Sequence, residues 1–169
     1  GGGAANATYN IAKSLQKQGH EVSVVTSAFK SLTGYSIENN ISIYRLPSKR
    51  KAIDRSNLPE MLSFAYHALQ NIKEIIKEKK INKTIAFFSV HCGIVSYLMF
   101  KKYKIPYIVS LRGGDVPGLV PELNMLHTII KPFRRAILKN AVSIVANSVG
   151  LAELALKTDP FQVDVIQNG

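Results

Sequence analysis

One stretch of the chain, Ser110-Leu111-Arg112-Gly113-Gly114-Asp115-Val116-Pro117-Gly118, combines a cation, two flexible residues and a carboxylate. It follows a short apolar run typical of a parallel strand, so we expect it at the carboxyl edge of a sheet, where α/β proteins bind ligands. Arg112 and Asp115 are candidates for catalysis, and Gly113 and Gly114 for ligand binding. The alternative interpretation is an Arg112–Asp115 pair that braces a glycine-rich turn.

A second candidate is the glycine loop Gly1-Gly2-Gly3, which a helical pattern follows at once. Successive glycines let a backbone approach a phosphate closely, and a helix N-terminus offers free N–H groups. Gly2 and Gly3 are therefore candidates for a phosphate contact, unless the glycines serve only the shape of a helix-start turn. A dinucleotide cofactor is disfavoured, because Asn6 occupies the third glycine position and the strand ending Val25-Thr26-Ser27-Ala28 supplies no carboxylate.

Two further strand exits carry polar side chains. Asn147 and Ser148 follow one predicted strand and His91 follows another, so all three are candidates for ligand binding. Ser148 is equally an N-cap for the next helix, and a lone loop histidine is more often structural or merely exposed. We expect no metal and no other cofactor, because the sequence has no Cys/His cluster.

Alternating strands and helices must position these residues. Apolar residues at three- and four-residue spacing predict helices at residues 4–15, 58–79, 93–103, 123–139 and 149–156. Short β-branched or apolar runs predict strands at residues 21–26, 41–46, 84–88, 107–111, 142–146 and 163–166, of which the second alternates like a strand near a sheet edge. The fold class is therefore α/β, with a Rossmann-like, doubly wound parallel sheet.

Both ends of this pattern are abrupt, at the glycine loop and at the strand exit Gln167-Asn168-Gly169. In a doubly wound sheet a central strand precedes the glycine loop, and losing it leaves neighbouring strands with unpaired backbone groups. We therefore expect the first strand of the fold to be missing from this sequence, together with chain beyond residue 169.

Composition places the chain among ordinary globular domains. Its 169 residues suffice for one domain, and its single cysteine, Cys92, excludes an internal disulfide. No apolar run reaches the roughly 18 residues of a membrane span, and the default expectation is a cytoplasmic protein. An excess of 22 Lys+Arg over 11 Asp+Glu favours an anionic partner, or serves only solubility.

The ordered motifs resemble the N-terminal domain of family 4 retaining glycosyltransferases of the GT-B fold. The resemblance covers nearly the whole chain, and its pieces are Gly2-Gly3 with Leu15, Gly19-His20-Glu21-Val22 with Val24-Val25-Thr26, Ile105 to Gly118, Ala141 to Ser148, and Val165-Ile166-Gln167-Asn168-Gly169.

The resemblance implies two Rossmann-like domains that face a cleft, with residues 1–169 as the acceptor-side domain. The C-terminal domain, which binds the nucleotide sugar, is absent from this sequence, so this chain alone is expected to be inactive. Gly2 and Gly3 would reach the donor diphosphate, while Arg112 and Asp115 would be catalytic. Acceptor-binding candidates are His91, Gly113, Gly114, Asn147 and Ser148. Family members often carry His where Arg112 stands, which leaves Arg112 open to an acceptor phosphate instead.

The resemblance predicts an enzyme of the hexosyltransferase type, involved in polysaccharide biosynthesis. It would move a sugar from a nucleotide-diphosphate sugar to a glycan or lipid-linked acceptor, with retention. The alternative is a non-catalytic module that binds nucleotides or sugar phosphates. A basic helix with Lys131, Arg134, Arg135 and Lys139, and the residues Lys49, Arg50, Lys51 and Arg55, suggest peripheral contact with an anionic membrane, or an ordinary solvated face. A nucleic-acid partner is not expected, since no exposed aromatic array interleaves the basic residues.

Overall fold

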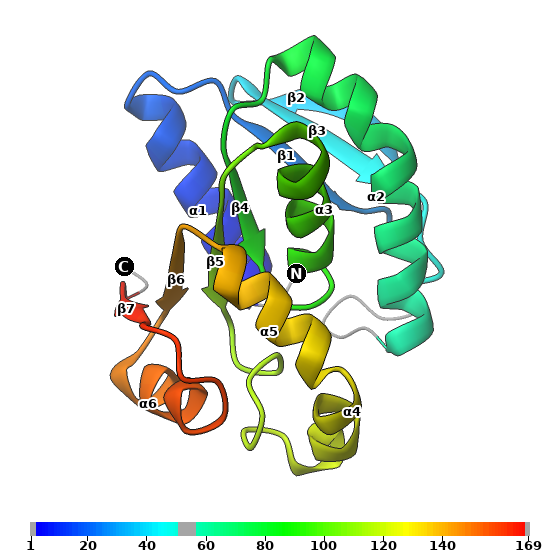
Figure 1. Ribbon diagram of the computed structural model, residues 1–169. Coiled ribbons are helices and arrows are strands. Elements are labelled where there is room, and N and C mark those ends of the chain that lie inside the picture. The colour runs from blue at the N-terminus through cyan, green and yellow to red at the C-terminus, as the bar shows by residue number, and fades with distance from the viewer. Residues whose placement is uncertain (1–2, 51–56, 168–169) are drawn as a thin grey trace. The chain divides into compact units, whose positions relative to one another are not determined.

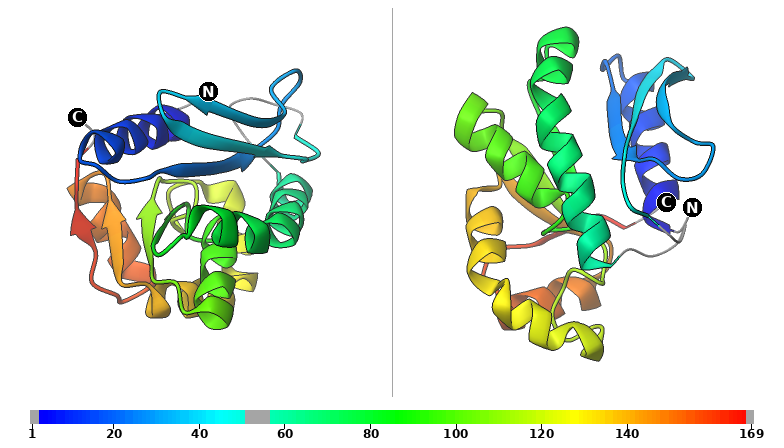
Figure 2. Two further views of the ribbon diagram at one scale, coloured as in Figure 1. Left: turned by 90° about the horizontal axis from the view of Figure 1, so that it is seen from above. Right: turned by 90° about the vertical axis from the view of Figure 1, so that its right-hand side faces the viewer.

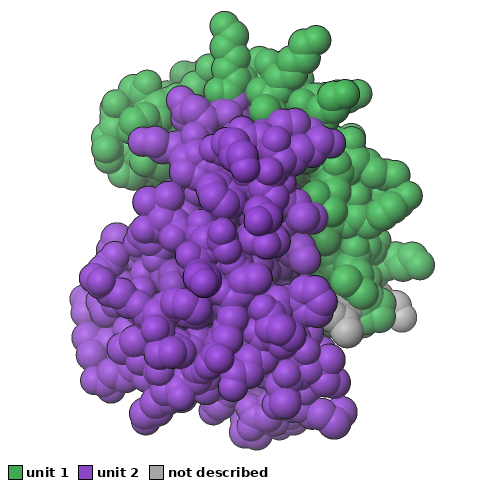
Figure 3. Space-filling model, viewed as in Figure 1, with its two compact units in different colours: residues 1–80 green, residues 81–169 purple. Residues whose placement is uncertain are grey.

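The computed structural model describes residues 3–50 and 57–167 (Figure 1). The chain divides into two compact units, residues 1–80 and residues 81–169, which Figure 3 shows in different colours. Each unit has its own sheet. Among the described residues, no helix is long and apolar enough to cross a membrane.

Unit 1 is a three-stranded sheet with helices packed against it (Figure 2). The strand order is β1-β3-β2, with β1 parallel and β2 antiparallel to β3. Ala12 packs on Ile41 and Ile43 to form a small core. The elements are α1 (Gly3–Lys17), β1 (Ser23–Ser27), β2 (Gly34–Glu38), β3 (Ile41–Leu46) and α2 (Leu58–Lys79).

The β2–β3 hairpin is the main departure of unit 1 from the sequence prediction. Strand β2 was not predicted, and the expectation that residues 41–46 lie near an edge is wrong, because β3 lies between β1 and β2. The hairpin turns at Asn39 and Asn40, which both adopt left-handed backbone angles, with φ of 51° and 60°. Asparagine tolerates this conformation better than most residues, and it is the geometry that a two-residue hairpin turn requires.

Helix α2 begins with a capping box, and its boundaries agree with the sequence prediction. The side chain of Asn57 accepts a hydrogen bond from the backbone N–H of Glu60, and the Glu60 carboxylate accepts one from the N–H of Asn57. These bonds satisfy two groups that a helix start otherwise leaves without partners. Phe64, Ala68, Ile72 and Ile75 lie on its buried side.

Unit 2 is a four-stranded parallel sheet in the order β4-β5-β6-β7. Its core is made by alternate residues of β5 and by Ile144 and Ala146 of β6, covered by α5 and α6. The buried Tyr107 hydroxyl donates to the carbonyl of Ile137, which ties β5 to α5. The elements are β4 (Thr84–Phe87), α3 (Gly93–Tyr103), β5 (Tyr107–Leu111), η1 (Pro121–Leu123), α4 (Asn124–Ile129), α5 (Lys131–Asn140), β6 (Ser143–Ala146), α6 (Val149–Thr158) and β7 (Asp164–Val165).

These elements confirm the predicted fold class, an α/β fold with a parallel sheet flanked by helices. One prediction was wrong in detail, since the helix expected over residues 123–139 is divided into η1, α4 and α5. The division between α4 and α5 falls at Ile130, one residue before Lys131-Pro132. Proline lacks an N–H and is favoured in the first turn of a helix, so Pro132 lies in the first turn of a new helix, α5, rather than continuing α4.

Candidate functional site

The carboxyl ends of β4, β5 and β6 meet at one edge of the unit 2 sheet. Phe87 of β4 pairs with Ser110 of β5, and Leu111 of β5 pairs with Ala146 of β6. The loops that follow these strands carry His91, Arg112 to Asp115, and Asn147-Ser148. The sequence placed all of these residues at strand exits, and the register brings the three exits together, where parallel sheets bind ligands.

Asp115 is buried and holds this edge together. Its carboxylate accepts hydrogen bonds from the backbone N–H groups of Arg112 (3.0 Å), Gly113 (3.1 Å) and Ser89 (2.7 Å). The Ser89 hydroxyl also donates to the Asp115 carbonyl at 3.3 Å. Burial raises the pKa of the Asp115 carboxyl, while the hydrogen bonds from Arg112 and Ser89 act to lower it. Asp115 therefore joins the loop after β5 to the loop after β4, and a catalytic role for it stays a prediction.

Arg112 lies over the ring of Phe87, with 4.6 Å between Cζ and the ring centroid. This cation–π contact joins the exit of β5 to the last residue of β4. Desolvation lowers the pKa of the guanidinium and the Asp115 carboxylate raises it, but an arginine keeps its proton at neutral pH. The group is thus a fixed, half-buried cation at the ligand edge, suited to an anionic or hydroxylated ligand.

The two glycines of the loop have different roles in its shape. Gly113 has a φ of +112°, and a Cβ there would come within 2.8 Å of Leu119 Cδ2. Gly114 has no atom within 4 Å of a Cβ built at its position, so a side chain fits there. The backbone conformation therefore requires glycine at position 113 but not at position 114.

The remaining predicted residues of unit 2 lie at the same edge. His91 is half-buried and stacks on Phe88, with ring centroids 5.1 Å apart and planes at 15°. Ser148 caps α6, because its hydroxyl accepts from the N–H of Leu151 at 3.3 Å, so the N-cap interpretation is confirmed. Asn147 is half-buried. Ligand contacts by these three residues stay predictions.

The predicted diphosphate loop belongs to unit 1. Gly3 is the first residue of α1 and is exposed, with open space where a Cβ would be. Gly2 lies outside the described residues, as do Lys51 and Arg55 of the predicted basic patch.

Comparison with known proteins identifies the family. The sequence profile of Glycosyltransferase Family 4 matches residues 1–169, the whole chain. The chain belongs to glycosyltransferase family 4. Among solved structures, it is similar to sucrose-phosphate synthase from Thermosynechococcus elongatus, with a TM-score of 0.68 and 15% identity over 94% of this chain and 81% of that chain. At this identity the likeness shows the fold, which is that of a GT-B N-terminal domain. Among curated protein sequences, none matches.

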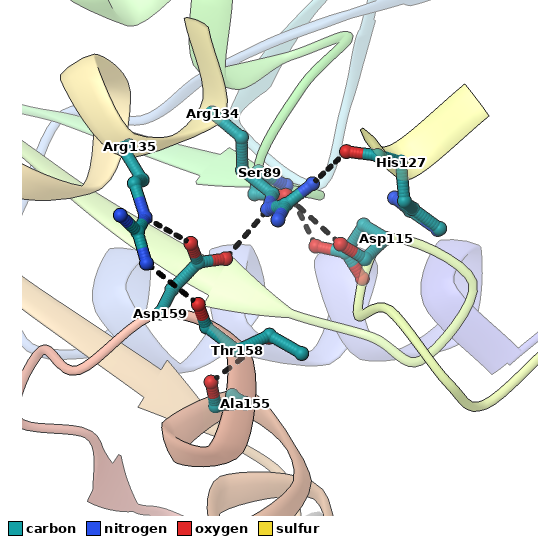
Figure 4. Close-up of polar contacts among 8 residues, drawn as sticks. All are labelled: Ser89, Asp115, His127, Arg134, Arg135, Ala155, Thr158 and Asp159. Atoms are coloured by element: carbon teal, nitrogen blue, oxygen red, sulfur yellow. Dashed lines mark hydrogen bonds and ion pairs between the residues drawn. The ribbon is translucent and has the colours of Figure 1, made fainter. Parts of the chain in front are cut away.

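This glycosyltransferase family 4 domain also contains a buried ion network that the sequence analysis missed (Figure 4). Asp159, which ends α6, accepts from Arg134 Nε at 2.6 Å and from Arg135 Nε at 2.9 Å. Arg134 also donates to the carbonyl of His127 at 2.9 Å, and Arg135 to the carbonyl of Thr158 at 2.9 Å. The network joins α4, α5 and the end of α6. Together with Asp115 and Ser89 it lines a cavity of about 10 Å³, about the size of one water molecule.

The network corrects part of the predicted basic surface. Arg134 is 2% exposed and Ile137 is 1% exposed, so neither belongs to a membrane-facing patch. A signal was present in the sequence, because Arg134 is spaced four and three residues from Ile130 and Ile137 and therefore shares their helical face. A buried arginine needs a carboxylate, but nothing in the sequence pairs Arg134 with Asp159, 25 residues later.

Two further titratable groups, Cys92 and His127, lie in the described part of unit 2. Burial raises the pKa of the Cys92 thiol to about 12, so it is no nucleophile at neutral pH. His127 is buried, and its pKa is lowered mainly by desolvation and then by the nearby charge of Arg134. The Gly114 carbonyl and the Asp115 and Asp159 carboxylates act to raise that pKa. Among the described residues, no three His, Cys, Asp or Glu side chains form a group that could hold a metal ion.

Proposed function

We propose that the protein containing this chain transfers a sugar from a nucleotide-diphosphate sugar to a glycan or lipid-linked acceptor, with retention of anomeric configuration. The observation that carries the proposal is the family match over the whole chain. The convergence of three polar strand exits at one edge of the unit 2 sheet supports it. Hexosyl transfer in polysaccharide biosynthesis is the form of the reaction that we propose.

The residues of this domain would serve the acceptor side of the reaction. Arg112 offers a fixed cation, held by Phe87, to charge that develops near the reacting sugar or to an acceptor phosphate. Asp115 would keep the Arg112 backbone in place, and Gly3 would leave room for the donor diphosphate at the start of α1. The C-terminal domain would supply the nucleotide-sugar site, so residues 1–169 alone would be inactive.

A release assay on the full-length protein tests the proposal. The protein is incubated with a panel of nucleotide sugars, with and without glycan and lipid-linked acceptors, and free nucleoside diphosphate is measured. We expect release with one donor, increased by an acceptor. A folded protein that neither releases nor binds a nucleoside diphosphate across the panel would contradict the proposal.

A second candidate is a non-catalytic module that binds nucleotides or sugar phosphates. It is favoured by the position of Asp115, whose carboxylate is buried among backbone donors, and by arginine in place of the histidine frequent in the family. Nucleoside diphosphate binding without turnover in the same panel supports this candidate. A pair of glutamates in the donor domain, as the family carries, favours the enzyme.

The anionic membrane contact is proposed on a revised set of residues. Met125, Ile129 and Phe133 recur every four residues along α4 and α5, and they are 77%, 66% and 64% exposed. Lys131 and Lys139 are exposed on α5, and Arg135 is half-buried. Apolar side chains beside basic ones suit a peripheral helix at an anionic surface, where lipid-linked acceptors reside. We place this contact on the cytoplasmic face of a membrane.

A further inference from the structure

Unit 1 contains a cavity of its own. Its volume is about 380 Å³, within the range of roughly 300–1,000 Å³ that is typical of small-molecule sites. It is lined by Ala28, Phe29, Lys30, Thr33, Gly34, Arg45, Pro47, Ser48 and Arg50. Residues 28–30 follow β1 and residues 47–50 follow β3, so the cavity lies at the carboxyl ends of two parallel strands.

Among the residues that the structure describes, the charged ones lining the cavity are Lys30, Arg45 and Arg50, which are all cations. Arg45 is held in place, because its guanidinium donates to the Ser36 hydroxyl at 2.6 Å and to the Glu38 carboxylate at 2.5 Å. Its side chain is 14% exposed, against 49% for Glu38. Glu38 neutralises part of this charge, and Arg45 lowers the pKa of Glu38 by donating that hydrogen bond. A guanidinium has five N–H donors, so it can bind a further anion beside these two partners.

Arg50 and Lys30 come from the two loops that border the cavity. Arg50 donates to the hydroxyl of Ser27, the last residue of β1, at 2.9 Å. Lys30 is exposed and lies in a tight turn closed by two hydrogen bonds between Phe29 and Leu32, both 3.0 Å. The Ser48 hydroxyl donates to the carbonyl of Ala28 at 3.1 Å and joins the two loops. The loops are thus fixed to one another, and their cations face a shared space.

We propose that this cavity binds a phosphate group carried by the acceptor. Two guanidinium groups and an ammonium group match a phosphate, which takes several charge-assisted hydrogen bonds and often binds arginine in a bidentate manner. The uncharged residues Thr33 and Gly34 line the same space. The identity of the ligand as an acceptor rests on the proposed function, whereas the phosphate site rests on the cavity and its cations alone.

The test is calorimetric titration of the full-length protein with inorganic phosphate. We expect Arg50→Gln and Lys30→Gln each to weaken phosphate binding, and the double variant to weaken it about tenfold or more. Arg50→Lys keeps the charge and should restore most of the affinity. The matched control is Lys17→Gln, which removes an exposed lysine of α1 and should leave phosphate affinity unchanged. Arg112→Gln tests the competing assignment of the phosphate to the edge of the unit 2 sheet.

The outcome that overturns the proposal is equal phosphate affinity in the wild type and in the Lys30/Arg50 double variant, with folding of both verified by thermal unfolding. Loss of binding in Arg112→Gln alone also overturns it and assigns the phosphate to unit 2. Competition by glucose 6-phosphate indicates a soluble phosphorylated acceptor, and competition only by phosphatidic acid vesicles indicates a lipid phosphate. Nucleoside diphosphate release is measured separately, so the phosphate site can fail while the glycosyltransferase proposal stands, and the reverse.

Discussion

At the scale of single residues, Asp115 and Arg112 at the edge of the unit 2 sheet make different kinds of contact. Asp115 accepts three backbone hydrogen bonds and is 7% exposed, so its carboxylate is occupied in organising the loop. The Arg112 side chain is half-buried and packs on one face of Phe87. The Asp115 carboxylate thus serves the loop backbone, whereas contact between the Arg112 charge and a ligand stays a prediction.

Replacing Arg112 with alanine in the full-length protein should reduce turnover at least tenfold, or about 1.4 kcal/mol of barrier. The reason is the loss of a positioned cation at the edge where the strands end. Steady-state nucleoside diphosphate release is the measurement, with Arg112→Lys as the comparison that keeps the charge but not the planar group. Activity within about twofold of wild type would assign Arg112 to loop bracing only.

The two loop glycines allow a matched stability test. Gly113→Ala should destabilise the protein by about 1–2 kcal/mol or more, because a residue with a Cβ is strained at positive φ. Gly114→Ala should change the free energy of unfolding by no more than about 0.5 kcal/mol, since open space surrounds its Cβ position. Urea denaturation of both variants measures the difference. Equal effects would show that the loop relaxes around either side chain.

The sequence allowed the residues of the edge to be predicted but not the contacts among them. Strand exits are visible as apolar runs followed by polar residues, so Arg112, His91 and Ser148 could be placed. The bond from Ser89 to Asp115 spans 26 residues and depends on how two loops pack, which no local pattern encodes. The predicted contact between Arg112 and Asp115 does brace the loop, but the donor is the backbone N–H of Arg112. No local sequence pattern encodes that detail either.

At the scale of elements, strong local signals set most boundaries. Helices α2 and α3 and strands β3 and β5 have the bounds that their periodicity predicted. Strand β2 was missed because it is short and mostly exposed, although Asn39-Asn40 is a hairpin signal. The division of α4 from α5 depends on Pro132, which can also be read as a kink in one long helix. Elements were therefore misjudged where a short turn motif decides between two structures.

The ion network between α5 and α6 predicts that replacing Asp159 lowers the free energy of unfolding much more than replacing Arg135 does. Asp159→Asn should destabilise the protein by about 3–5 kcal/mol, because it leaves the buried Arg134 guanidinium without its carboxylate. Arg135→Gln should cost no more than about 1 kcal/mol, since the Arg135 side chain is 43% exposed and Asp159 keeps Arg134. Chemical denaturation of both variants is the measurement. A small effect of Asp159→Asn would mean that water reaches Arg134.

At the scale of the whole molecule, the net charge of +11 is concentrated neither in one run nor on one element. In the described part of the chain, Lys30, Arg45 and Arg50 line the cavity of unit 1, and unit 2 holds exposed lysines beside the apolar side chains of α4 and α5. Composition indicated an anionic partner, but it could not distinguish a phosphate site from a lipid surface. The two require different geometry: a cavity with fixed donors for phosphate, and exposed apolar side chains beside basic ones for a membrane.

The membrane contact can be tested with a pair of substitutions at equally exposed positions. Phe133→Asp should weaken binding of the full-length protein to anionic vesicles at least about fivefold, because it replaces an inserting apolar group with a repelled charge. Leu62→Asp makes the same kind of change on α2, where Leu62 is 62% exposed against 64% for Phe133, and should have little effect beyond its added charge. Co-sedimentation with phosphatidylglycerol vesicles is compared with phosphatidylcholine vesicles at two salt concentrations. An equal loss of vesicle binding in both variants would mean that the contact is general electrostatic attraction. If neither variant lost vesicle binding, the exposed apolar side chains of Met125, Ile129 and Phe133 would have no role at the membrane.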